Sequence, residues 1–145
     1  YSISFLLPMY GKSFSTLGKM LDPISQYSCA FYERTAIFAD YDGVANGPDE
    51  GINIAKALGD KEFCILQNHG ILTTGTMVDT AVWYFLNMED ACKSQLLAEA
   101  VGEPKIIPHE TACATRDYVA NDLSAYVSFQ PTIDVLWEEE PDLLD

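Results

Sequence analysis

Two short apolar runs with a polar tetrapeptide between them constrain the fold of this chain more than any other feature. Phe63-Cys64-Ile65-Leu66 and Ile71-Leu72-Thr73-Thr74 each have the length and character of a strand. Gln67-Asn68-His69-Gly70 separates them. We interpret these polar residues, lying between two apolar runs on the same path, as a site carried by a strand. The segment therefore predicts a β-sheet with a functional position at or near His69.

Short strands and helices alternate along the rest of the chain. The predicted strands cover residues 2–7 and 35–38, and a loop is predicted from Asp40 to Gly47. The predicted helices are a segment from Pro8 to near Gly18, residues 24–32, Pro48 to Gly59, about Met77 to Val101, about Glu110 to Ala120, and a last helix that starts at Pro131. This alternation indicates a mixed α/β domain.

The helix from about Met77 to Val101 is the clearest single element. Thr76 and Asp79 form an expected start signal for it. Its first half is apolar on all sides, so we expect Trp83, Tyr84 and Phe85 to pack in the core rather than to line a pocket. Glu89 lies on the same helix, and the simplest explanation for its charge is a pair with Lys93 at i+4.

Composition and charge exclude several classes of partner. The chain has 145 residues, with 22 acidic against 8 basic side chains and a formal net charge of −14. We therefore expect neither nucleic-acid binding nor attachment to an anionic membrane. No apolar run approaches the ~20 residues needed to span a bilayer. The length fits one domain, or part of a larger one.

The four cysteines, at positions 29, 64, 92 and 113, form no Cys-x-x-Cys pair. We interpret them as reduced, mostly buried thiols of a cytoplasmic protein. The chain begins at Tyr1, and its first residues have neither a basic stretch nor a cleavage site typical of a targeting signal. We expect a chain whose N-terminal part is missing.

Three segments, in this order, carry a resemblance to a known family. Tyr10-Gly11-Lys12-Ser13-Phe14-Ser15-Thr16-Leu17-Gly18 resembles the helix that follows the metal-binding strand of the class II aldolase/adducin head family. Asn68-His69-Gly70-Ile71-Leu72-Thr73-Thr74-Gly75 resembles its Asn-His-Gly motif, and residues 80–96 resemble its next helix. The resemblance covers residues 1–103 with motifs and the remainder more loosely.

The resemblance implies an αβα fold with a central, largely antiparallel sheet flanked by helices. Residues 1–145 would form one such domain, the C-terminal portion of the family's domain, with 104–145 as a helical, acidic extension. Enzymatic members cleave small hydroxy-carbonyl compounds such as sugar phosphates. They hold a divalent metal, usually zinc, with three histidines, and are commonly homotetramers with sites near subunit interfaces. Two of the histidines come from a His-x-His pair on a strand and the third from the Asn-His-Gly motif.

This chain departs from the family pattern at two of the three ligands. His69 matches the third metal ligand, but Phe5 and Leu7 stand where the His-x-His pair is expected. The family's upstream acid/base carboxylate and phosphate loop have no counterpart. We therefore expect a catalytically impaired relative of the lyases. The alternatives are a non-catalytic, adducin-like cytoskeletal scaffold, or an active lyase whose site is completed by other residues or by a partner subunit.

The two histidines have structural explanations as well. The His69 ring could form a hydrogen bond at a strand kink, where Gly70 leaves room for close packing. His109 follows Pro108 and matches no family ligand. We expect it at the surface, beside the start of a helix, and not as a ligand.

Overall fold

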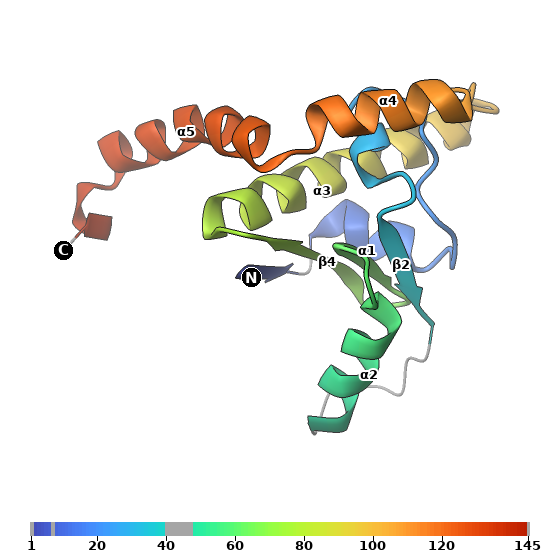
Figure 1. Ribbon diagram of the computed structural model, residues 1–145, viewed down its shortest axis with the longest axis horizontal. Helices are drawn as coiled ribbons and strands as arrows, with labels where there is room; N and C mark the ends of the chain where they lie inside the picture. The colour runs from blue at the N-terminus through green and yellow to red at the C-terminus, as the bar shows by residue number, and fades with distance from the viewer. Residues whose placement is uncertain (1, 7, 40–47, 145) are drawn as a thin grey trace.

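The computed structural model describes residues 2–6, 8–39 and 48–144. Leu7 and the loop expected from Asp40 to Gly47 lie outside these residues. Figure 1 shows the ribbon with its helices and strands labelled.

A four-stranded sheet forms the centre of the fold. Its strands are β1 (Ser2–Leu6), β2 (Thr35–Phe38), β3 (Phe63–Leu66) and β4 (Gly70–Gly75), in the order β1-β4-β3-β2. The β1–β4 and β4–β3 pairs are antiparallel, and the β3–β2 pair is parallel. The prediction of a central, largely antiparallel sheet is therefore confirmed.

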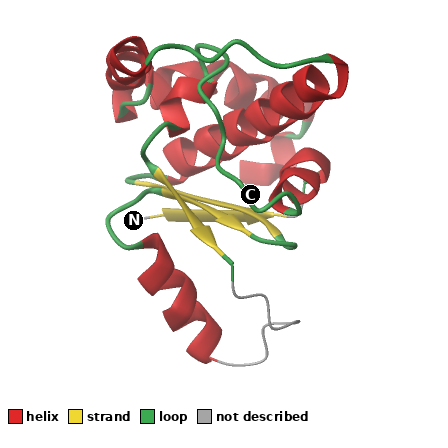
Figure 2. Ribbon diagram, turned by 90° about the vertical axis from the view of Figure 1, so that its right-hand side faces the viewer, coloured by secondary structure: helices red, strands yellow, loops and turns green. Residues whose placement is uncertain are grey.

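Helices cover both faces of the sheet, unequally (Figure 2). The α-helices are α1 (Met9–Ser15), α2 (Pro48–Leu58), α3 (Val78–Val101), α4 (His109–Val119) and α5 (Asp122–Glu139), and the 3-10 helices are η1 (Ser28–Phe31) and η2 (Pro141–Leu144). Figure 2 shows α2 alone on one side and the other helices on the opposite side. This is the αβα arrangement expected. In the described part of the chain, no helix is both long and apolar enough to cross a membrane.

The alternation of side chains along β3 divides the core in two. Phe63 and Ile65 belong to the larger cluster with α1, η1, α3 and α5, whereas Cys64 and Leu66 belong to the smaller cluster against α2. All four are buried. This two-sided burial explains why the run is apolar at every position instead of every second one. Trp83, Tyr84 and Phe85 are buried in the larger cluster, as predicted.

The structure corrects the interpretation of residues 63–75 as one path interrupted by polar residues. β3 and β4 are antiparallel neighbours, and Leu66 pairs with Gly70, so the chain reverses direction over Gln67, Asn68 and His69. Asn68 adopts φ 60°, a left-handed conformation that asparagine tolerates better than most residues. The N–H of His69 donates to the carbonyl of Leu66 at 2.9 Å and closes the turn. The polar segment is therefore a hairpin turn.

Two predicted helix boundaries and one predicted helix cap are also wrong, for local reasons. Pro131 lies inside α5, because Asn121 caps an earlier start by accepting the N–H of Ser124 at 2.9 Å. Thr76 does not cap α3, since its hydroxyl donates to Asp122 at 2.7 Å. Residues 24–32 form only the short η1, preceded by a turn in which the Ser28 hydroxyl accepts backbone N–H groups.

Candidate functional site

The hairpin turn that carries His69 is fixed to two neighbouring elements. The N–H of Gln67 donates to the carbonyl of Phe38, at the end of β2, at 2.9 Å. The N–H of Asn68 donates to the carbonyl of Ser15, at the end of α1, at 3.3 Å. The His69 side chain is partly buried. Two of the segments that carry the family resemblance, α1 and the Asn-His-Gly motif, therefore meet at this turn.

β1 lies beside the strand that begins one residue after His69. In the antiparallel register, Phe5 pairs with Leu72 and Leu6 with Ile71, so the C-terminal end of β1 runs toward the start of β4. This is the neighbourhood in which the family places its three metal ligands. By the family resemblance, the His-x-His positions correspond to Phe5 and Leu7, residue types that have only hydrocarbon side chains.

Of the three residues that the resemblance assigns to the family's metal site, His69 alone is of a type that can bind a metal. A catalytic zinc site uses about three protein ligands, and here one of the three positions offers a nitrogen. Among the described residues, one group of three or more histidine, cysteine or acidic side chains is close enough to share an ion, and it does not include His69. His69 alone would be a weak ligand.

Glu89 has a role that the sequence did not reveal. Its carboxylate accepts the N–H of Tyr10 at 2.8 Å and the N–H of Gly11 at 2.5 Å, in the first turn of α1. Pro8, the residue before this helix, provides no side-chain cap. Glu89 therefore supplies the missing acceptor, and a negative charge at the positive end of the helix, from α3. The predicted pair with Lys93 is wrong, since the Lys93 ammonium lies 5.2 Å from the centroid of the Tyr10 ring.

Replacing Glu89 with glutamine should lower the free energy of unfolding by about 2 kcal/mol, the range for hydrogen bonds to a charged group. The amide keeps one acceptor oxygen but turns an NH2 group toward a backbone N–H. Chemical denaturation measures the loss. Lys93→Met is the matched control and should cost less than about 1 kcal/mol, the upper range for an exposed cation–π contact. Equal losses would instead support the i,i+4 pair.

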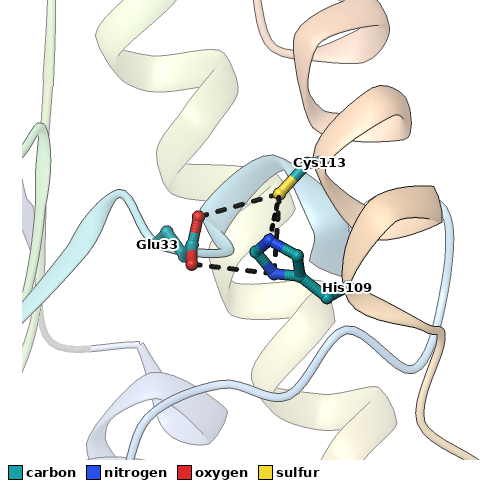
Figure 3. Close-up of side chains that lie close together, drawn as sticks. All are labelled: Glu33, His109 and Cys113. Carbon is teal, nitrogen blue, oxygen red and sulfur yellow. Dashed lines mark hydrogen bonds and ion pairs between the residues drawn. The ribbon is translucent and has the colours of Figure 1, made fainter.

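A second cluster of possible ligands lies away from the hairpin turn. Glu33 follows η1, and His109 and Cys113 lie one turn apart on α4. Figure 3 shows the three side chains directed toward one another. The Cys113 sulfur lies 3.7 Å from a Glu33 oxygen and 3.8 Å from each ring nitrogen of His109, and Nδ1 of His109 lies 3.8 Å from the other Glu33 oxygen.

The exposed position expected for His109 is confirmed, but its neighbours were not foreseen. The spacing of His109 and Cys113 by four residues on a predicted helix is the signal that could have revealed half of the cluster. Glu33 lies 80 residues before Cys113 and could not have been paired with it from the sequence.

The four cysteines are free thiols, three buried and one, Cys113, partly buried, as expected. Burial raises the pKa of Cys64 to about 11 and that of Cys92 to about 12. These two thiols therefore stay protonated and unreactive at neutral pH.

Residues 2–96 match the class II aldolase and adducin N-terminal domain. The chain belongs to this family. Class II aldolases are generally metal-dependent, often oligomeric, and act on small-molecule substrates.

A solved structure of a class II aldolase confirms the fold, and curated relatives match the sequence. L-fuculose 1-phosphate aldolase from Glaciozyma antarctica PI12 superposes with a TM-score of 0.85 at 37% identity, over 97% of this chain and 53% of that one. Decarboxylase NovR from Streptomyces niveus is 35% identical, over 98% of this chain and 53% of its own length. Meiotically up-regulated gene 14 protein from Schizosaccharomyces pombe is 41% identical, over 85% of this chain and 49% of its own length. The chain spans about half the length of the curated relatives it matches.

Proposed function

We propose that this chain is a class II aldolase-type domain, derived from metal-dependent carbon–carbon lyases, that does not catalyse lyase chemistry by itself. One observation carries the proposal. Phe5 and Leu7 occupy the two histidine positions of the family's metal site, and β1 pairs with the strand that follows His69.

The chemistry explains why two lost ligands are decisive. Cleavage of a carbon–carbon bond beside a carbonyl leaves an enolate, whose charge a Lewis-acid metal can stabilise. Such a metal must be held by about three protein ligands and keep open positions for substrate. One imidazole does not meet the first requirement. The ancestral substrate would be a small hydroxy-carbonyl compound, such as a sugar phosphate, by resemblance to the L-fuculose 1-phosphate aldolase.

Two other functions remain as alternatives to this proposal. The family includes the adducin head, so a non-catalytic interaction scaffold of the cytoskeleton fits the same loss of ligands. An active lyase would need the missing ligands from other residues or from a partner subunit.

We further propose a cytoplasmic homo-oligomer, a tetramer by resemblance. The free cysteines and the exposed apolar side chains of α5 (Val135, Leu136 and Trp137) support this.

Restoring both ligands tests the proposal. In a Cys113→Ser background, which removes the thiol of the second cluster, Phe5→His with Leu7→His should raise zinc affinity by at least about 100-fold, since even the loss of an outer-shell partner costs about 10–100-fold. Titration calorimetry measures the gain. Adding His69→Asn to the restored chain should remove it. A folded double variant that gains no affinity would contradict the placement of β1 beside His69.

The metal content of the Cys113→Ser chain that keeps Phe5 and Leu7 tests directly whether the metal site is lost. After exposure to zinc and removal of loosely held ions, elemental mass spectrometry should find well below one ion per chain. About one retained ion that is lost again in His69→Asn would overturn the proposal, and would show that other residues or a neighbouring subunit complete the site.

A further inference from the structure

The second cluster joins two parts of the chain that are distant in sequence. Glu33 belongs to the turn between η1 and β2, while His109 begins α4 and Cys113 lies one turn further along it. One ligand atom from each side chain lies within 4.8 Å of the others. Figure 3 shows a sulfur, a carboxylate and an imidazole gathered around one point at the surface.

We propose that Glu33, His109 and Cys113 bind a zinc ion, at a site separate from His69. The donor set selects the metal. Sulfur and imidazole nitrogen are ligands that Zn²⁺ prefers, whereas Ca²⁺ and Mg²⁺ prefer sites made of oxygen atoms. Three protein ligands leave a fourth position for water.

The ligand atoms lie close enough for small side-chain movements to produce tetrahedral coordination. Zinc bonds of about 2.0–2.3 Å at tetrahedral angles place neighbouring ligand atoms roughly 3.3–3.6 Å apart. One ligand atom from each of the three residues lies within 4.8 Å of the other two, and the Cys113 sulfur lies 3.8 Å from Nε2 of His109. The 3.7 Å contact of Cys113 and the 3.8 Å contact of Nδ1 of His109 are to different oxygens of Glu33. Movement of about 1 Å, by side chains at the surface, would bring the ligand atoms to the spacing of tetrahedral zinc.

Two neighbours already orient the ligands. The hydroxyl of Tyr32 lies 3.2 Å from Nδ1 of His109, which leaves Nε2, 3.8 Å from the Cys113 sulfur, to bind the metal. A metal-binding histidine usually has its other ring nitrogen hydrogen-bonded in this way. Arg116 lies 3.3 Å from one oxygen of Glu33 and fixes its carboxylate. Arg116 also competes for that oxygen, and the other oxygen of Glu33 faces His109.

The charge of the site and of the chain favours a cation. Zinc binding displaces the proton of the Cys113 thiol to the solvent, because the metal binds the thiolate. The bound thiolate and the Glu33 carboxylate together balance the charge of Zn²⁺. The net charge of −14 raises the local concentration of cations at the surface.

Cobalt(II), alone, is the probe for the test, because it replaces zinc and reports a bound thiolate by charge-transfer absorption in the near ultraviolet. The full chain, freed of metal and kept reduced with a non-thiol phosphine, should develop this absorption up to one cobalt per chain. Zinc should then abolish it by displacement. Cys113→Ser should remove the absorption. Loss of an outer-shell partner typically weakens metal binding by about 10–100-fold. His109→Asn and Glu33→Gln should each weaken cobalt binding by more than this, because each removes a direct ligand.

Two control variants separate this site from the other candidate ligands. His69→Asn should leave the cobalt titration unchanged, as should Cys29→Ala, which removes a buried thiol outside the cluster. Circular dichroism checks that each variant is folded. An absorption that is absent from the parent chain, that persists in Cys113→Ser, or that disappears in His69→Asn would overturn the proposal. None of these results depends on whether the chain has lyase activity.

Discussion

Gly75→Ala should lower the free energy of unfolding by about 3 kcal/mol or more, the upper range for overpacking a filled interior. Gly75 ends β4 directly beneath the first turn of α3. A methyl group there would lie 2.3 Å from the hydroxyl oxygen of Thr80 and 2.5 Å from the backbone nitrogen of Ala81. Because the nearer obstacles include backbone, α3 would have to move. The buried hydrogen bond from the Thr73 hydroxyl to the Ala81 carbonyl, 2.9 Å long, would be stretched as well.

Thermal unfolding should show this as a fall in Tm of about 10 °C for a chain of this size. Gly51→Ala is the matched control. Gly51 lies in α2 with nothing within 4 Å of an added Cβ, so alanine should stabilise the chain by about 0.5–1 kcal/mol through its helix propensity. A neutral Gly75→Ala would show that α3 can move away from β4 at no cost.

Phe63→Ala should lower the free energy of unfolding by about 3–5 kcal/mol, the range for truncating a buried phenylalanine. The Phe63 side chain is fully buried, and its ring makes edge contacts with Phe31 and Tyr84, each at a centroid distance of 5.0 Å. The Arg34 guanidinium lies 5.2 Å from the centre of the same ring. Truncation would leave a cavity between η1 and α3 and remove a cation–π contact. Urea denaturation measures the effect from the shift in midpoint at constant m-value.

Tyr118→Ala is the control for the loss of an aromatic ring as such. Tyr118 is 81% exposed on α4, so its truncation should change stability by less than about 0.5 kcal/mol. If Phe63→Ala were as mild as this control, β3 would not be the centre of the core.

The sequence was informative where one local pattern controls the outcome. Apolar patterning predicts the strand over 35–38 and the long α3. A glycine in the left-handed conformation, Gly59, marks the end of α2. The residues around Pro131 show the limit of such rules. Proline is common in the first turn of a helix. Here Asn121 caps an earlier start, and Pro131 lies inside the helix.

The sequence was less informative where the decisive partner is distant. Nothing local to Glu89 indicates that its carboxylate serves the first turn of α1, 78 residues away at Gly11. The same holds for Glu33 beside α4. His69 is the opposite case, since a motif identified it. Even there, only pairing of the strands showed that its polar segment is a turn.

The β3–β4 hairpin followed immediately by α3 implies an order of folding. Residues 63–101 contain two adjacent strands and a helix that pack on one another, so their contacts have short sequence separations and low loop-closure entropy. β1 can complete the sheet only by finding β4 across more than 60 residues of intervening chain. We therefore expect the hairpin and α3 to form first and to act as a template, which the strand that carries Phe5 joins later.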